Sequence, residues 1–391
     1  MTTKNILNYK LFKKSDSNKK FNESLDYEKL VTEKLSSFFY GKKTSREDFF
    51  LTSSARSSLN IIFKSLAFES ESEVIILGHT CAEVPNVLLI NNLIPIYCDI
   101  DLDTFTFDRE DLFRKIRHET KAIIIQHHLG ICDLDFAMIN SFKEKGIIVI
   151  EDCALSLGSS YKGIKAGSLG NFSVFSFGKS KTFNSYIGGC IKVNSSNSIE
   201  KIRMHYNSLI ELPSTKIRIL KAVFLIENKI YNSPFFYAYF PFLIILKIIF
   251  KILKVNYHVP ETNLNLAIQK FDFKLPKFFI FLLFNYLEDI NLLIVQQNER
   301  ILDILSDVSN NNSEKCLPKA YFDKDYFICS NRIIINKKDK YLELFSKFNI
   351  VNSRYNFYSK PVDGNLSSSN YKKGMCPNSE YLCDNMAQIS V

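Results

Sequence analysis

The residues best suited to chemistry lie in the middle of the chain, where a carboxylate and a lysine each follow a β-type run. Asp152 ends the apolar segment 146–152, and Lys181 comes just after the segment 172–177. A lysine amine can form a Schiff base with a carbonyl, and a buried carboxylate can hold a protonated ring nitrogen. Because ligands of α/β sheets bind at the carboxyl ends of strands, we expect the two side chains to share one site.

A third feature is suited to a phosphate. Small polar residues precede a predicted helix, 55–66, whose first amides belong to Ala55 and Arg56. A helix N-terminus offers unpaired N–H groups and the positive end of a dipole to an anion. Ser176, at the end of the run before Lys181, adds a hydroxyl donor. A lysine, a carboxylate and phosphate donors are together the parts of a site for pyridoxal phosphate (PLP).

The remaining candidates have alternative interpretations. His127 and His128 end a β-type run, and strand histidines are more often packed or hydrogen-bonded than bound to a ligand, so contact of one of them with cofactor or substrate is the second expectation. Cys153 is expected to be a small core residue rather than a nucleophile. Arg56 is equally suited to binding a phosphate or carboxylate and to lying on a helix surface. Most lysines are solvated, so Lys181 is singled out only by its companions.

Short apolar runs alternate with amphipathic helices from residue 49 onward. Parallel strands need helical crossovers, so this alternation predicts an α/β fold with a mostly parallel sheet covered on both faces. We predict strands at 74–77, 94–100, 121–128, 146–152 and 172–177, and helices at 27–39, 55–66, 84–91, 109–116 and 136–144.

At 391 residues, the chain is long enough for a large domain and a smaller one. We expect a polar segment with a helix, a large PLP-binding domain, an apolar helical region and a small α+β domain, at 1–48, 49–205, 206–300 and 301–391. Within the last part we predict a polar linker at 306–315, a strand at 327–335, a helix at 339–348 and a strand near Ile350.

The formal net charge of +9 indicates an anionic partner. The lysines are scattered and no nucleic-acid-binding motif is present, so we expect no nucleic acid but a phosphorylated small molecule or an anionic membrane. The nine cysteines contain no C-x-x-C pair, which predicts buried free thiols and no metal site. The first residues lack the apolar core of a signal peptide, and we expect a cytoplasmic protein.

The stretch 230–246 contains no charged residue. It is slightly short for a spanning helix and two prolines interrupt it. Three lysines on one helical face follow it, Lys247, Lys251 and Lys254. Two interpretations remain open for this region and for the apolar patch 278–287. One is a set of buried helices at a domain or dimer interface, and the other is peripheral contact of 230–254 with the inner face of an anionic membrane.

Residues 49–193 resemble the DegT/DnrJ/StrS family of sugar aminotransferases, which are PLP enzymes of fold type I. The resemblance depends on motifs in a fixed order, and the ordered set is specific although each motif alone is weak. The motifs are the phosphate-binding turn and helix, the P-x-x-x-D-x-D-x-x-T-F strand, the following strand and loop, the Asp-to-FSF-x-x-x-K segment and a C-P-x-x-E helix, at 54–66, 95–108, 126–135, 151–181 and 375–390.

The resemblance implies a large domain with a seven-stranded sheet, a small C-terminal domain and a role for each matching residue. Lys181 matches the lysine that carries PLP and moves protons, and Asp152 matches the partner of the pyridine nitrogen. Phosphate contacts are implied for Ser176 and the amides of Ala55 and Arg56. The full set of cofactor positions is Ala55, Arg56, Cys81, His127, Asp152, Ser176 and Lys181.

The implied reaction is transfer of an amino group, usually from glutamate, to a nucleotide-linked keto sugar for polysaccharide or glycan synthesis by a homodimer. The chain departs from the family pattern at Leu155, where a glutamine is usual, and at Thr182. It also lacks the usual segment through which a neighbouring subunit reaches the phosphate. Two alternatives therefore stay open: a PLP-dependent sugar dehydratase, against which the intact Lys181 argues, and a non-catalytic, membrane-associated regulatory or scaffold protein.

Overall fold

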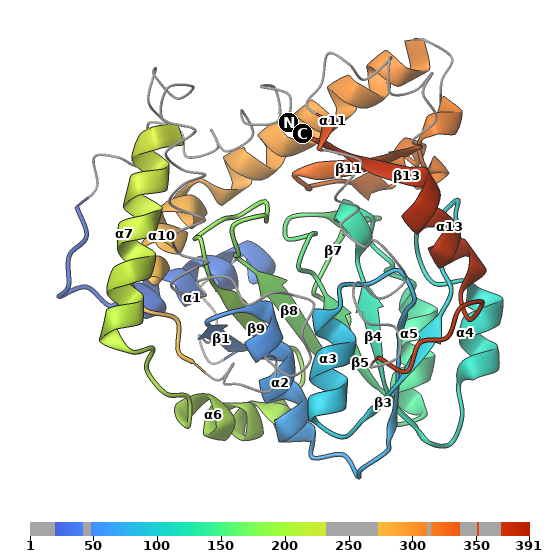
Figure 1. Cartoon of the computed structure of the whole chain (residues 1–391), viewed down its shortest axis with the longest axis horizontal. Coiled ribbons are helices and arrows are strands. Elements are labelled where there is room, and N and C mark those ends of the chain that lie inside the picture. Colours follow the sequence, from blue (N-terminus) through green and yellow to red (C-terminus); the bar gives the residue numbers. More distant parts are fainter. Residues whose placement is uncertain (1–19, 42–47, 232–272, 311–313, 337–349, 352–368) are drawn as a thin grey trace.

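A seven-stranded sheet forms the centre of the computed structural model, which describes residues 20–41, 48–231, 273–310, 314–336, 350–351 and 369–391 (Figure 1). The strand order is β1-β9-β8-β5-β4-β2-β3. The strands are β1 (Phe49–Thr52), β2 (Glu73–Leu77), β3 (Ile94–Cys98), β4 (Thr120–Gln126), β5 (Ile148–Asp152), β8 (Phe172–Ser176) and β9 (Gly189–Val193).

The sheet confirms the predicted α/β class. Strands β3, β2, β4, β5 and β8 are parallel, and β9 runs antiparallel to both β8 and β1. The predicted helices at 55–66 and 136–144 coincide with α2 (Ala55–Leu66) and α5 (Phe136–Glu144). Each begins at a side-chain cap, since Ser54 accepts from the Ser57 amide and Asp135 from the Met138 amide.

Helices cover both faces of the sheet, because successive strand residues point to opposite sides. In β2, Val74 and Ile76 pack into one core with Leu59 of α2, while Ile75 and Leu77 pack into another with α5 and α11. Near β1 and β8 this second face is covered by α1, α7 and α10. The covering helices include α1 (Tyr27–Tyr40), α3 (Glu83–Ile90), α4 (Arg109–Lys115), α6 (Ile199–Asn207), α7 (Ser214–Tyr231), α10 (Lys277–Glu288) and α11 (Ile290–Asn310).

The predicted strand at 327–335 is wrong as a single element. Its two ends belong to different sheets: β10 (Tyr326–Phe327) pairs with β6 (Ser160–Tyr161), and β11 (Arg332–Asn336) pairs with β13 (Met386–Ser390). Between them, side chains satisfy the backbone. Ser159 Oγ accepts from Cys329 N at 2.9 Å, and Gln297 Nε2 donates to Ser330 O at 2.8 Å. These bonds let the chain leave one sheet and enter the next.

Two other C-terminal expectations need correction. The predicted linker at 306–315 begins inside a helix, since α11 continues to Asn310 and buries Val308. The segment 375–390 is a helix only in its first half, α13 (Pro377–Asn385), and then continues directly as β13. The predicted helix at 339–348 lies outside the described residues. A short strand, β12 (Ile350–Val351), pairs with β13. Strands β11, β13 and β12 in this order form a three-stranded sheet, called the small sheet below.

The apolar patch 278–287 is buried in α10, which packs against α1. This agrees with the buried-helix interpretation for that segment. Residues 232–272, including the three lysines of the membrane hypothesis, lie outside the described part of the chain. Among the described residues, no single helix is long and apolar enough to cross a membrane, although α10 and α11, bent by 68° at their junction, meet the length and composition test as a pair.

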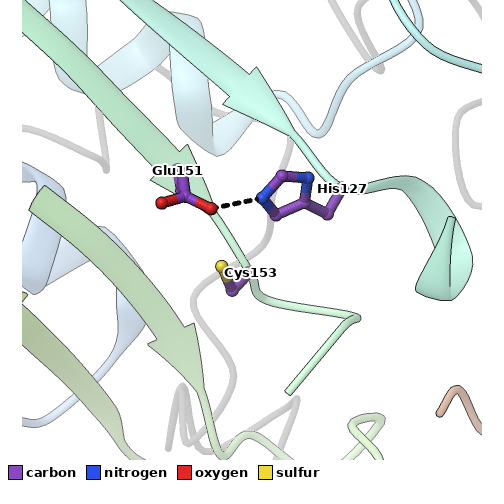
Figure 2. A group of neighbouring side chains, drawn as sticks. All are labelled: His127, Glu151 and Cys153. Carbon is purple, nitrogen blue, oxygen red and sulfur yellow. Dashed lines mark hydrogen bonds and ion pairs between the residues drawn. The ribbon is translucent and has the colours of Figure 1, made fainter. Parts of the chain in front are cut away.

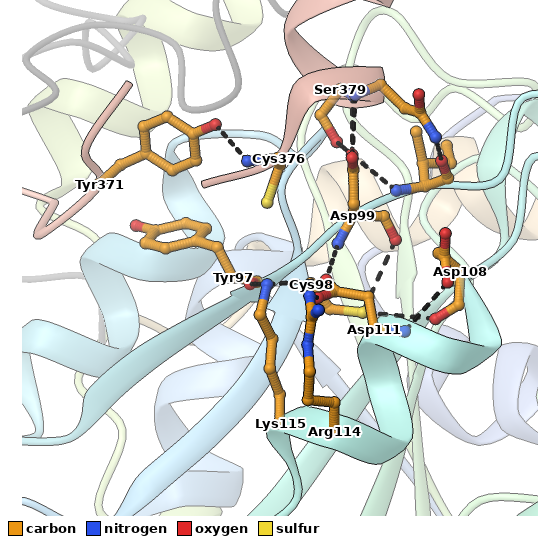
Figure 3. A network of polar contacts seen from close by, with 12 residues as sticks. Tyr97, Cys98, Asp99, Asp108, Asp111, Arg114, Lys115, Tyr371, Cys376 and Ser379 are labelled. Carbon is orange, nitrogen blue, oxygen red and sulfur yellow. Dashed lines mark hydrogen bonds and ion pairs between the residues drawn. The ribbon is translucent and has the colours of Figure 1, made fainter. Parts of the chain in front are cut away.

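Asp99 attaches the C-terminal helix to the sheet (Figure 3). Its carboxylate accepts hydrogen bonds from Asn378 N, Ser379 N and Ser379 Oγ, each at 2.8 Å. It thereby caps the first turn of α13, whose own N-cap residue, Cys376, makes no side-chain cap bond. Gly78 permits the approach, since a Cβ there would lie 2.7 Å from Cys376 Sγ.

Glu151, on β5, is fully buried and accepts four hydrogen bonds. One oxygen accepts from His127 Nε2 at 2.8 Å (Figure 2) and from Gly167 N at 2.7 Å, and the other from Leu169 N at 2.6 Å and Gly170 N at 2.5 Å. Burial alone raises the pKa of this carboxyl, but the bonds from His127 and the backbone amides outweigh it and hold the pKa below its ordinary value. Glu151 therefore connects β4, β5 and the turn that leads into β8.

We expect Glu151→Gln to lower the free energy of unfolding by about 3–5 kcal/mol at pH 7, because the amide nitrogen faces donors and the buried charge-assisted bonds are lost. Urea titration measures this loss, with the exposed Glu144→Gln as control. The pKa of Glu151 is lower in the folded protein than its unfolded value of about 4.3. Its contribution to the free energy of unfolding is therefore present above that value and is lost as the pH falls through the folded pKa. The difference between wild type and Glu151→Gln should therefore shrink below about pH 4. A difference independent of pH would contradict this account.

We expect Asp99→Asn to release α13 from the sheet at a cost of about 2–3 kcal/mol, because hydrogen bonds to a charged acceptor are lost at a helix N-terminus. Hydrogen exchange should become faster at Asn378 and Ser379 while the exchange of β4 and β5 stays slow. The exposed Asp303→Asn on α11 is the control for loss of one negative charge. Unchanged protection of α13 would show that other contacts hold it.

Candidate active site

The predicted site residues gather at the carboxyl edge of the sheet. Asp152 is the last residue of β5 and Ser176 the last of β8. Gly189, which opens the antiparallel strand β9, pairs with Ser176 on one side and with Thr52 at the end of β1 on the other. The turn into α2 begins immediately after β1, so Ser176 and this turn lie at the same level of the sheet.

Asp152 is a buried carboxyl beside the candidate lysine. Among the described residues its carboxylate accepts one hydrogen bond, from Ala154 N to Oδ1 at 3.0 Å. Burial raises the pKa of Asp152, and the Ala154 amide and the positive charge of Lys181 act in the opposite direction. The structure therefore brings Asp152 and Lys181 within electrostatic reach of one another. A buried carboxyl in this condition is suited to a cationic partner.

Lys181 lies in a compact loop that follows β8. The loop is closed by hydrogen bonds from Lys181 N to Gly178 O at 2.9 Å and from Ser185 N to Phe177 O at 3.0 Å. The small sheet contacts the residues on both sides of Lys181. Asn331 Nδ2 donates to Ser180 O at 2.9 Å, and Asn331 N donates to Thr182 Oγ1 at 3.2 Å. Thr182 thus has a structural partner 149 residues away.

The N-terminal turn of α2 is suited to binding an anion. Ser54 caps the helix, and the amides of Ala55 and Arg56 precede the first amide that donates within the helix, Ser58 N, which binds Ser54 O. Gly189 makes room for the turn, since a Cβ there would lie 2.3 Å from the carbonyl carbon of Ser54. Among the described residues, the fully buried Ser57 hydroxyl in the same turn has no hydrogen-bond partner. Because of the close approach at Gly189, the turn into α2 packs directly against the start of β9, beside Ser176.

The side chains of Arg56 and Cys81 have other surroundings. Arg56 Nε forms an ion pair with Glu83 at the start of α3, with both side chains 14% exposed. This joins the first turns of two helices at the sheet edge, and it leaves the Arg56 backbone amide as the group suited to a phosphate. Cys81 is half-buried, forms no disulfide, and lies between β2 and α3. Its carbonyl accepts from Val84 N at 3.0 Å.

His127 is hydrogen-bonded inside the protein, as the first interpretation expected. Its Nε2 binds Glu151, and its Nδ1 accepts from Asp133 N at 3.1 Å, so the ring proton is on Nε2. Its backbone amide donates to Asp152 O at 3.0 Å. His127 therefore orients the strand end that carries Asp152.

His127, Glu151 and Cys153 lie close enough to be considered as metal ligands, with their donor atoms within 4.8 Å of one another (Figure 2). The hydrogen bonds argue against that use, because a metal would displace bonds that already occupy Glu151 and both ring nitrogens of His127. Burial also raises the pKa of the Cys153 thiol well above its ordinary value, whereas a metal binds thiolate. All nine cysteines lie in the described part of the chain, where none forms a disulfide and all but Cys81 are buried.

Sequence reasoning missed a polar chain next to the site. His79 Nδ1 lies 3.1 Å from His128 Nε2, His128 Nδ1 lies 2.7 Å from Gln126 Nε2, and Thr80 Oγ1 donates to Gln126 Oε1 at 2.6 Å. Burial lowers the pKa of His128 to about 4 and that of His79 well below its ordinary value. Both imidazole rings are therefore neutral at physiological pH. The chain joins the residues before Cys81 to the end of β4. The polar sequence Gln126–His128 after an apolar strand was the available signal.

The model of the DegT/DnrJ/EryC1/StrS aminotransferase family matches residues 41–216 of this chain. The protein MJ1066 of Methanocaldococcus jannaschii is 32% identical over 152 residues, which are 39% of each chain. GDP-perosamine synthase of Escherichia coli O157:H7 is 33% identical over 138 residues, which are 35% of this chain and 38% of that one. The matches therefore span less than two fifths of the length of these relatives.

Solved structures resemble a larger part of the chain. The protein Spr1654 of Streptococcus pneumoniae, in its PMP form, aligns with a TM-score of 0.65 at 18% identity and covers 100% of this chain and 92% of its own. A DegT DnrJ EryC1 StrS aminotransferase from Brucella abortus aligns with a TM-score of 0.62 at 16% identity over 93% and 85% of the two chains. These structures establish the fold, that of PLP enzymes of fold type I. Residues 41–216, somewhat less than half of the chain, are thus similar to the DegT/DnrJ/EryC1/StrS aminotransferase family.

Proposed function

We propose that this protein is a PLP-dependent aminotransferase that moves an amino group to a nucleotide-linked keto sugar. The observation that carries the proposal is the buried carboxyl of Asp152 beside Lys181, at the sheet edge where the α2 turn and Ser176 also lie. The family match supports the reaction class, and Spr1654, a structural neighbour, has been solved in a PLP form and a PMP form.

The residues present fit PLP on three counts. The Asp152 carboxyl is buried, has one hydrogen bond among the described residues and is suited to a protonated ring nitrogen. The first amides of α2 and the Ser176 hydroxyl match a phosphate in charge and hydrogen-bonding character. Lys181 provides the amine. Leu155 is buried in the core, with 6% exposure, so the usual contact from that position is replaced by packing.

When bound, PLP supplies a ring that accepts the electron pair left when a proton leaves the substrate carbon. The residues of this chain prepare that chemistry. Asp152 would keep the ring nitrogen protonated, and the positive end of α2 would hold the phosphate. Lys181 Nζ would be the amine that holds the cofactor and the base that moves a proton at the reacting carbon of the substrate. Glu151 and His127 keep the end of β5 in register with β4, which holds the Asp152 carboxyl at the site.

The substrate side of the proposal is supported by the relatives. GDP-perosamine synthase is named for a nucleotide-linked amino sugar. We infer glutamate as the amino donor and a homodimer as the working form. The alternative of a dehydratase is less favoured because the lysine at position 181 is intact.

The purified protein with added PLP should be yellow, and borohydride should fix PLP on the peptide that contains Lys181. Lys181→Ala should be colourless and unlabelled, because the only amine proposed to hold the cofactor is gone. Absorbance and mass spectrometry of the labelled peptide measure both effects. The exposed Lys145→Ala is the matched control and should behave as wild type. Unchanged colour and labelling in Lys181→Ala would overturn the assignment.

Asp152→Asn should still bind PLP but convert it to the amine form with glutamate about 10²–10³-fold more slowly, because the ring nitrogen loses its anionic partner. Stopped-flow absorbance under single-turnover conditions measures the rate. The exposed Glu144→Gln should retain the wild-type rate. Wild-type conversion by Asp152→Asn would remove this residue from the mechanism, and absence of conversion in wild type would favour the non-catalytic alternative.

A further inference from the structure

A buried glutamate interrupts the apolar covering helix α7. Glu227 is 4% exposed, and the segment around it, 222–231, is otherwise mostly apolar. Burying a carboxylate is costly unless it is paired and hydrogen-bonded. Glu227 therefore requires specific partners. The structure places those partners in the loop that carries Lys181.

Glu227 binds two residues of that loop, one on each side of Lys181. Its Oε2 forms an ion pair with Lys179 Nζ and accepts a hydrogen bond from Tyr186 OH at 3.2 Å. The Lys179 and Glu227 side chains are 12% and 5% exposed, so the pair is largely withdrawn from solvent. Lys179 Nζ also lies 5.3 Å from the centre of the Tyr186 ring, which adds a cation–π contact.

Tyr186 shows that the loop is held in an unfavourable conformation. Its φ is +76°, a region that a bulky non-glycine residue rarely adopts. The surrounding helices hold the ring in place. Phe224 of α7 contacts it edge-on at 5.6 Å, and Phe279 of α10 stacks on it at 6.1 Å with an interplanar angle of 12°. Glu227 binds the hydroxyl of the same side chain.

The two bound residues are also connected to each other through the loop. Asn184 Nδ2 donates to Lys179 O at 2.8 Å, and Tyr186 N donates to Asn184 Oδ1 at 2.7 Å. Together with Lys181 N to Gly178 O, these bonds make 178–186 one compact unit. Movement of either end would therefore displace Lys181. A buried ion pair seldom stabilises a protein more than apolar residues in its place would. What the Glu227–Lys179 pair gives is therefore a fixed geometry between α7 and the lysine loop.

We propose that Glu227 is a positioning residue that holds Lys181 in place by binding Lys179 and Tyr186 from α7. The inference rests on the proposed function only in taking Lys181 as the residue that carries PLP. It assigns a role to the apolar helices α7 and α10, which is to support the lysine loop. Glu227 acts through its two partners and does not itself touch the cofactor.

The first test uses the full chain without added PLP, so it does not depend on the proposed function. In Glu227→Gln, hydrogen exchange at the amides of Lys181 and Ser185 should be at least about tenfold faster than in wild type, because a buried charge loses its partner and the loop opens. Leu220→Ala, a buried substitution on the same helix, is the control for general weakening of α7. It should lower the melting temperature without the selective effect at the loop.

A charge-reversed pair provides the rescue. The double variant Lys179→Glu with Glu227→Lys restores an ion pair and should bring loop exchange back toward wild type, whereas each single reversal should not. Tyr186→Phe removes one hydrogen bond and should give an intermediate effect. Wild-type exchange in Glu227→Gln, or an equal effect in Leu220→Ala, would overturn the proposal.

The second test uses the PLP-loaded protein. In Glu227→Gln the midpoint of the pH-dependent absorbance of bound PLP should shift by about half a pH unit or more, because Lys181 changes its position relative to Asp152. Leu220→Ala should keep the wild-type midpoint. An unshifted midpoint in Glu227→Gln would contradict positioning. If wild type binds no PLP, the proposed function fails, while the exchange experiment still decides whether Glu227 holds the loop.

Discussion

The buried carboxylate of Glu151 is the interaction on which the site depends. Its four hydrogen bonds join the end of β4, through His127, to the turn at 167–170 that leads into β8. The next residue is Asp152, and β8 leads to Ser176 and then to Lys181. One satisfied buried charge therefore sets the spacing between the strands that lead to Asp152, Ser176 and Lys181. Removing it would leave several buried donors unpaired, which explains why its effect on stability is expected to be large.

The same edge of the sheet is completed by distant parts of the chain. The small sheet reaches the lysine loop through Asn331, which binds on both sides of Lys181. Its helix α13 is attached to the main sheet by Asp99. The C-terminal part is thus connected both to the lysine loop and to the residue that follows β3. A change in either attachment would alter how the small sheet meets the site.

The apolar covering helices have a role in this arrangement. Phe279 of α10 and Phe224 of α7 pack around Tyr186, while Glu227 binds it and Lys179. A strongly apolar composition here agrees with burial against α1 and the lysine loop. The basic segment that follows 230–246 lies outside the described residues, so the membrane hypothesis stays a prediction.

The sequence by itself determined the five parallel strands of the sheet, because continuous apolar runs between amphipathic helices are the local pattern that burial on both faces requires. It also singled out Asp152, Ser176 and Lys181 as candidates, since residues at the carboxyl ends of strands converge in any such sheet. Only the tertiary structure decided how these residues are held: the partners of Glu151 and Lys179 lie up to 48 residues away in the sequence. Those contacts depend on which surfaces pack together, and no local periodicity encodes that. For the same reason the segment 327–335, one apolar run in sequence, is divided between two sheets.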